Sequence, residues 1–181
     1  MEGLLGGQAQ GLTLGTFHGI CARILRREAE RLPFDQNFVI FDADDQEKLV
    51  KQALKDLNVD EKKFNPGSVH GSISKAKNEL ISAEGYIIQN YRDEVVKRIF
   101  ARYQELLLAS NAVDFDDLLL CTANLLEEYP EVRQKYARRY EHILVDEFQD
   151  TNTAQYTLLK HLASAHQNIF VVGDEDQSIY R

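Results

Sequence analysis

Two adjacent carboxylates, Asp146 and Glu147, directly follow the apolar run Ile143–Val145. The run predicts a short buried strand of a parallel sheet, and ligands gather beyond the carboxyl ends of such strands. One carboxylate can hold Mg²⁺ while its neighbour orients or deprotonates a water. This is the arrangement that phosphoanhydride hydrolysis requires, because positioning and charge neutralisation carry most of its catalysis.

A second apolar run, residues 169–172, ends in the polar stretch Gly173–Gln177. A helix-like segment lies between the two runs, so they predict a βαβ unit with both polar tips at one sheet edge. The chain has 29 Asp and Glu, and other acidic pairs such as Asp44 and Asp45 occur in helix-like surroundings. Those pairs are interpreted as solvated faces or helix caps.

Composition limits the class of protein. A chain of 181 residues can bury a real core, and its net charge of −8 neither supports nor excludes DNA, because its basic runs adjoin acids. Cys21 and Cys121 show no metal-type spacing and are predicted to be reduced core residues of a cytoplasmic protein. The sequence shows no membrane-span pattern and no signal peptide, so we expect no membrane partner.

The elements that must position the carboxylates are mostly helices. A strand is expected at 12–17, feeding a helix that ends near Leu32, and residues 38–41 are expected to be extended. Further helices are expected at 42–57, 65–80, 91–110, 114–126, from Pro130, and at 153–163. Phe115 and the leucines at 118–120 are assigned to the core. The pattern predicts a helix-rich α/β fold with few parallel strands and an all-helical insertion.

Two long segments resemble motifs of a known family. Asp146–Asn152 and Val172–Arg181 are similar to motifs II and III of superfamily 1 DNA helicases of the UvrD/Rep/PcrA type. Thr16–His18 resembles motif Ib, and Asp114–Leu119 resembles a further segment that precedes motif II. The segments stand in the family's order, so the resemblance covers essentially the whole chain.

The resemblance implies a fold and an activity. Residues 1–36 and 114–181 would be pieces of domain 1A, a RecA-like P-loop NTPase domain, and residues 37–113 its helical insertion, domain 1B. The parent protein would be an ATP-dependent 3′-to-5′ DNA helicase or translocase. It would use ATP and Mg²⁺ and act on single-stranded DNA and on junctions of single- and double-stranded DNA.

Site residues follow from the same resemblance. Asp146 would bind Mg²⁺ with the nucleotide, Glu147 would be the catalytic base, and Gln177 would contact the γ-phosphate. The expected DNA contacts are Thr16, Phe17, His18, Tyr180 and Arg181, with Tyr180 stacking on a base. Without the motifs, Tyr180 and Phe17 would be interpreted as packing aromatics, and His18 as a helix cap.

The chain also departs from the family pattern. No Gly-x-x-x-x-Gly-Lys-Ser/Thr loop occurs in it, and it has no tryptophan. The family's first motifs are expected upstream of Met1 and its second motor domain beyond Arg181, so the chain alone is predicted to be inactive.

Two alternatives remain open from the sequence. One is a fragment of a RecB/AddA-type helicase–nuclease, although Asp176 stands where those proteins usually carry lysine. The other is a non-enzymatic module in which residues 37–113 dock a repair or transcription protein through an exposed apolar patch.

Overall fold

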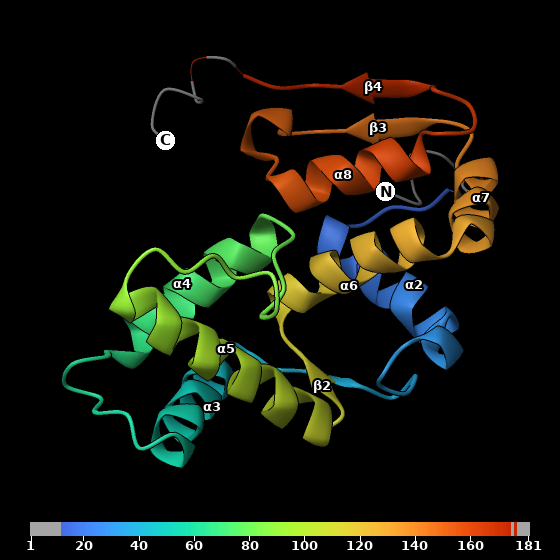
Figure 1. Cartoon of the computed structure of the whole chain (residues 1–181). Coiled ribbons are helices and arrows are strands. Elements are labelled where there is room, and N and C mark those ends of the chain that lie inside the picture. The colour runs from blue at the N-terminus through green and yellow to red at the C-terminus, as the bar shows by residue number, and fades with distance from the viewer. Residues whose placement is uncertain (1–11, 175, 177–181) are drawn as a thin grey trace.

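Helices dominate the computed structural model, which describes residues 12–174 and 176 (Figure 1). The α-helices are α2 (Phe17–Arg27), α3 (Ala43–Asp56), α4 (Pro66–Asn78), α5 (Tyr91–Ala109), α6 (Phe115–Glu128), α7 (Pro130–Arg139) and α8 (Thr153–Leu162). The strands are β1 (Val39–Ile40), β2 (Ala112–Val113), β3 (Ile143–Val145) and β4 (Ile169–Val171). Two 3₁₀ turns complete the order, η2 (Ala29–Arg31) and η3 (Phe148–Asp150). The helix-rich α/β prediction is therefore confirmed.

Polar caps fix where the helices begin. The side chains of Asp42, Asn65 and Asn90 each accept a hydrogen bond from a backbone N–H of the first turn of α3, α4 and α5. Pro66 adds a preset φ angle at the first position of α4. Such caps satisfy N–H groups that have no partner inside the helix. The expected starts of these helices are confirmed.

The core is divided into two clusters of buried side chains. One joins α2, α6, α7 and α8, and its members include Leu25, Leu118 and Leu158. The other joins α3, α4 and α5, and its members include Leu54 and Ile73. Figure 1 shows α3, α4 and α5 as a lobe beside the remaining helices. The domain boundaries at 36/37 and 113/114 stay a prediction.

A short parallel strand pair lies where the chain enters and leaves the α3–α5 lobe. Val39 pairs with Ala112 and Ile40 with Val113. The N–H of Phe41 donates to the carbonyl oxygen of Val113 at 2.9 Å. The sequence predicts that residues 38–41 are extended. It does not predict that they pair with β2, because the paired residues are more than seventy positions apart and no local pattern indicates the pairing.

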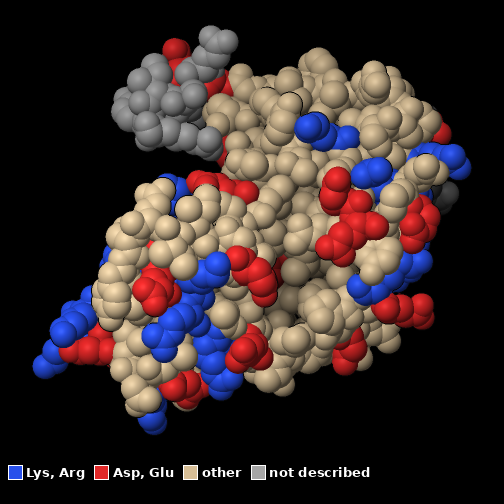
Figure 2. Space-filling model, viewed as in Figure 1, with Lys and Arg blue, Asp and Glu red and all other residues tan. Residues whose placement is uncertain are grey.

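The β3–α8–β4 unit confirms the predicted βαβ arrangement. β3 and β4 are parallel, with Ile143 opposite Ile169 and Val145 opposite Val171. The expectation that Ile143–Val145 is a buried strand is wrong for Leu144, which is 76% exposed, and right for Val145; Phe170, opposite Leu144, is 63% exposed. Helix α8 lies beside the pair in Figure 1, and few charged side chains cover this region in Figure 2. Within the described residues, therefore, an apolar sheet face is left uncovered.

Two further expectations are corrected near α2. The strand expected at 12–17 is absent: residues 12–16 have no hydrogen-bonded strand neighbour among the described residues, and Phe17 begins α2. The helix ends at Arg27 rather than near Leu32. The buried side chain of Glu28 turns toward α7 instead, where it accepts hydrogen bonds from Lys135 Nζ (2.6 Å) and Tyr136 Oη (2.8 Å).

A buried ion cluster joins the α3–α5 lobe to helix α6. Lys77, at the end of α4, is fully buried, and its Nζ lies 2.6 Å from Asp114 Oδ2 and 2.8 Å from Asp117 Oδ1. Tyr103 of α5 donates its hydroxyl to Asp114 Oδ2 at 2.8 Å, and Gln104 donates its amide to Asp117. Burial raises the pKa of Asp117 to about 6 despite the attraction of Lys77. The cluster therefore ties α4 and α5 to the start of α6.

The Asp114 cap makes this cluster part of the local structure as well. Asp114 Oδ1 accepts from the N–H of Asp117, and Asp117 Oδ2 accepts from the N–H of Asp114. This reciprocal capping box starts α6. Each of the two carboxylates therefore caps the start of α6 and also pairs with Lys77.

We predict that Lys77→Met destabilises the chain by roughly 3–5 kcal/mol, because two buried carboxylates lose their counter-charge. Urea unfolding measures the difference. The matched control is Lys48→Met: Lys48 is 74% exposed in its pair with Asp45, so its loss should change stability by less than about 1 kcal/mol. Equal effects of the two substitutions would contradict a structural role for the buried cluster.

Candidate functional site

The two carboxylates lie where the sequence placed them, at the carboxyl end of β3. Val145 is buried, whereas Asp146 and Glu147 are exposed. Asp146 Oδ1 accepts a hydrogen bond from the N–H of Glu147 at 3.0 Å. Glu147 has φ 52° and ψ 42°, a left-handed conformation that non-glycine residues rarely adopt. The chain turns sharply here, so both side chains stand at the sheet edge in contact with solvent.

The segment after β4 runs beside this turn. The N–H of Phe148 donates to Val172 O at 2.9 Å, and the N–H of Val172 donates to Val145 O at 2.8 Å. A Cβ atom at Gly173 would lie 2.9 Å from Gln149 Oε1, so only glycine allows this approach without a shift. The two strand ends therefore form one continuous edge.

Gln149 links the two segments, and the sequence analysis assigned it no individual role. Its Nε2 donates to Glu147 Oε2 at 2.5 Å. Its Oε1 accepts from the backbone N–H of Asp174 at 3.0 Å. A glutamine two residues after a candidate base only weakly indicates such a link in the sequence, because its second partner, the N–H of Asp174, lies 25 residues further along the chain.

The other predicted site residues within the described region lie at the start of α2. Thr16 Oγ1 accepts from the N–H of Gly19 at 3.2 Å, so Thr16 is the helix cap and His18 is not. Phe17 is half-buried against the first core cluster. The ring of His18 meets the ring of Phe115 edge to face, with centroids 5.8 Å apart.

His18 and Phe115 together present an aromatic surface. Partial burial lowers the pKa of His18, because it favours the uncharged ring, and the nearby Asp116 carboxylate opposes that effect. Phe115 is 48% exposed, which corrects its assignment to the core. As the first residue of α6, it lies one turn before the leucines that face inward.

Gln177, Tyr180 and Arg181 lie outside the described residues. The structure therefore places Asp146 and Glu147 at one sheet edge and Thr16, Phe17 and His18 at the start of α2. Their roles, and those of the three C-terminal residues, stay predictions.

A chain of polar side chains connects helices that flank these two groups. Asn152, which caps α8, donates its amide to Asn78 Oδ1 at the end of α4. Asn78 donates its own amide to Asp116 Oδ1 at 2.8 Å. Asp116 is also the carboxylate that acts on the pKa of His18. The end of the sequence segment 146–152 is thus held against both α4 and α6.

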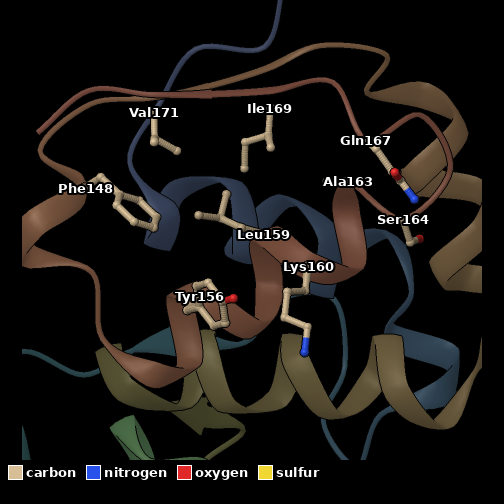
Figure 3. Close-up of a pocket in the computed structure, with 9 residues that line it drawn as sticks. All are labelled: Phe148, Tyr156, Leu159, Lys160, Ala163, Ser164, Gln167, Ile169 and Val171. Atoms are coloured by element: carbon tan, nitrogen blue, oxygen red, sulfur yellow. The ribbon is translucent and has the colours of Figure 1, made fainter.

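An open pocket of about 380 Å³ lies between α8 and the strand pair (Figure 3). Apolar side chains from α8, from β4 and from Phe148 of η3 line it, and Lys160 and Gln167 stand at its rim. Ile169 and Val171 point toward α8, so the pocket lies on the sheet face opposite to the exposed side chain of Phe170. The pocket is lined by neither Asp146 nor Glu147, so it is separate from the carboxylate pair.

Charge and apolar exposure on the α3–α5 lobe bear on the docking alternative. Figure 2 shows basic and acidic side chains interleaved over this lobe. The large apolar residues exposed between 37 and 113 are Val39, Ile87, Ile88, Tyr91 and Leu108. Three of them fall within five positions, just before and at the start of α5. No helix in the described part of the chain has the length and apolarity to cross a bilayer.

The strained backbone at Glu147 gives a testable consequence. We predict that Glu147→Gly is more stable than Glu147→Ala by about 1 kcal/mol, because glycine adopts positive φ without a Cβ clash. Both substitutions remove the same side-chain contact with Gln149, so their difference isolates the backbone. Thermal and urea unfolding of the two variants measure it; an alanine variant as stable as the glycine variant would refute the strain.

Comparisons with known proteins agree with this geometry. The UvrD/REP helicase N-terminal domain family matches residues 1–181. The ATP-dependent DNA helicase PcrA of Bacillus subtilis (strain 168) is 48% identical over 183 residues, which cover 100% of this chain and 25% of that protein. The PcrA helicase of Staphylococcus aureus (strain Mu50) is 46% identical over 182 residues, covering 99% of the chain and 25% of the relative.

The chain thus spans about a quarter of the length of these relatives. The family match covers every predicted site residue, including those outside the described region. The chain belongs to the UvrD/REP helicase N-terminal domain family.

Proposed function

We propose that this chain supplies part of the ATP site and part of the DNA path of an ATP-dependent 3′-to-5′ DNA helicase. The observation that carries the proposal is the exposed pair Asp146 and Glu147 at the end of β3, beside the segment that follows β4. Family membership adds support, since the relatives named above are ATP-dependent DNA helicases.

The carboxylate pair fits a nucleotide–metal site by its donor chemistry. Mg²⁺ in such sites is held by one or two carboxylates together with phosphate and water oxygens. Asp146 is exposed at a strand end and offers such an oxygen, and the described residues contain no cluster of three or more His, Cys, Asp or Glu that could hold a metal without the nucleotide. When bound, Mg²⁺ neutralises the charge that develops on the phosphates. Asp146 is therefore assigned to the metal.

Glu147 is assigned to the attacking water. A general base must lie within hydrogen-bond reach of the proton that it removes, and an exposed carboxylate at a strand end can meet a water held against the γ-phosphate. Gln177 is assigned to the γ-phosphate itself, because an amide can donate to phosphate oxygen and accept from water. The two side chains would then act on the same displacement from opposite segments.

The DNA path is assigned to Thr16, Phe17, His18, Tyr180 and Arg181. The ring of His18 is half-buried, and burial lowers its pKa, so it suits contact with a base or sugar better than ion pairing with phosphate. Tyr180 and Gln177 are three residues apart, so nucleotide state and base stacking would be coupled through one short segment. Such coupling is what movement along a single strand requires.

Hydrolysis by the chain alone can be measured directly. We expect no ATP hydrolysis above background from residues 1–181, because the sequence contains no phosphate-binding Gly-x-x-x-x-Gly-Lys-Ser/Thr loop. A coupled assay for released phosphate, with and without single-stranded DNA, measures it. Turnover that Glu147→Gln abolishes would show that the chain is active by itself.

A chimera tests the assignment of Glu147. Residues 1–181 would replace the matching segment of the Bacillus subtilis PcrA helicase, and the chimera would be assayed for DNA-stimulated ATP hydrolysis. Loss of the base in Glu147→Gln should lower kcat by about 10²–10⁴-fold with little change in the KM for ATP. A folded chimera that does not hydrolyse ATP, or one that Glu147→Gln leaves unchanged, would contradict the proposed function.

The DNA assignment is tested on the chain itself. We expect weak, salt-sensitive binding to an oligothymidine labelled with a fluorophore, and Tyr180→Ala should weaken it further, since stacking contributes about 1–3 kcal/mol per base. Fluorescence anisotropy measures the affinity, with Tyr156→Ala on α8 as the matched control because it makes the same substitution at an exposed tyrosine outside the proposed DNA path. Submicromolar binding that Tyr180→Ala leaves intact would remove Tyr180 from the DNA path.

A further inference from the structure

We propose that Gln149 is a positioning residue that fixes the Glu147 carboxylate relative to the segment after β4. The proposal rests on the proposed function, because it assigns Glu147 the role of base. Gln149 contacts the two groups through opposite ends of one amide: Nε2 donates to Glu147 Oε2 at 2.5 Å, and Oε1 accepts from the N–H of Asp174 at 3.0 Å.

The chemistry of the partners fixes the orientation of this amide. A carboxylate can only accept at neutral pH and a backbone N–H can only donate, so the amide nitrogen must face Glu147 and the amide oxygen must face Asp174. Among uncharged side chains, glutamine has both functions on one planar group at this length. Acidic residues surround it, and a glutamate at 149 would place a further negative charge beside Glu147.

The backbone around Gln149 holds the amide in place. Gln149 is part of η3, which begins directly after the left-handed residue Glu147. Phe148 N–H binds Val172 O at 2.9 Å, which anchors η3 to the end of β4. Gly173 leaves room for the amide oxygen, since a Cβ atom there would lie only 2.9 Å from it.

This geometry connects the base to the segment that carries the γ-phosphate contact. Asp174 lies three residues before Gln177, and its N–H is held by the same amide that holds Glu147. Glu147 is therefore oriented by the position of the segment after β4. We infer that Gln149 makes the orientation of the base depend on that segment, in addition to any contact that Gln177 makes with phosphate.

Two substitutions separate the two halves of the bridge. Gln149→Glu keeps an acceptor for the N–H of Asp174 but loses the donor to Glu147. Gln149→Met has a similar length and loses both. Gln155→Glu is the matched control, because it makes the same amide-to-acid change on α8. It also keeps a side-chain oxygen that can accept the hydrogen bond from the N–H of Asn152.

The structural arm uses the 181-residue chain. Amide hydrogen exchange at Asp174, followed by NMR, should accelerate at least about tenfold in Gln149→Met and stay unchanged in Gln149→Glu and Gln155→Glu. Unchanged exchange in Gln149→Met would overturn the bridge, whatever the activity of any variant.

The catalytic arm uses the chimera with the Bacillus subtilis PcrA helicase. Gln149→Glu should lower kcat about 10- to 100-fold, the factor expected when a hydrogen bond to a charged group is lost, and leave the KM for ATP within about twofold. Gln149→Met should lower kcat as well, and Gln155→Glu should lower neither quantity. An unchanged kcat in Gln149→Glu would overturn the positioning role.

The outcomes distinguish this proposal from the one on which it rests. If Glu147→Gln leaves the chimera active, the proposed function fails, and the exchange of the Asp174 amide still decides whether the bridge exists. If Glu147→Gln abolishes hydrolysis while Gln149→Glu does not affect it, the proposed function stands and the positioning role is wrong.

Discussion

The buried Lys77 ammonium between Asp114 and Asp117 is the constraint that fixes the α3–α5 lobe against helix α6. Lys77 ends α4, the two carboxylates start α6, and Tyr103 brings α5 to the same point. A buried charge is tolerated only with partners at good geometry, so these elements have little freedom to move apart. The adjacent contact between Asn78 and Asn152 extends this constraint to the start of α8, directly after the 146–151 turn.

Strands β3 and β4 position the residues of the candidate site. The parallel pair brings two strand ends to one edge, and η3 closes the turn between β3 and α8. The left-handed backbone at Glu147 costs free energy, which is a common property of functional residues whose surroundings hold them in place. Gln149 adds a side-chain contact to that restraint, so the orientation of Glu147 depends on two segments rather than on its own backbone alone.

Much of the fold was predictable because its signals are local. The caps Asp42, Asn65 and Asn90 and the apolar periodicity between them mark helix starts without any knowledge of the packing. The two apolar runs before polar tips likewise predicted the βαβ unit. The errors occur where burial or pairing with distant residues decides the outcome. They are the strand expected at 12–17, the early end of α2, and the exposure of Leu144 and Phe115.

The sequence by itself determined the family and suggested the class of chemistry that is proposed for the site. Asp146 and Glu147 after an apolar run, and the motif around them, are short-range patterns that need no folding to be seen. The tertiary structure alone decided which side chains meet across long separations. Lys77 reaches α6, Asn78 reaches Asn152, and Gln149 reaches the segment after β4. Such contacts depend on how helices and strands pack, and no local spacing specifies that packing.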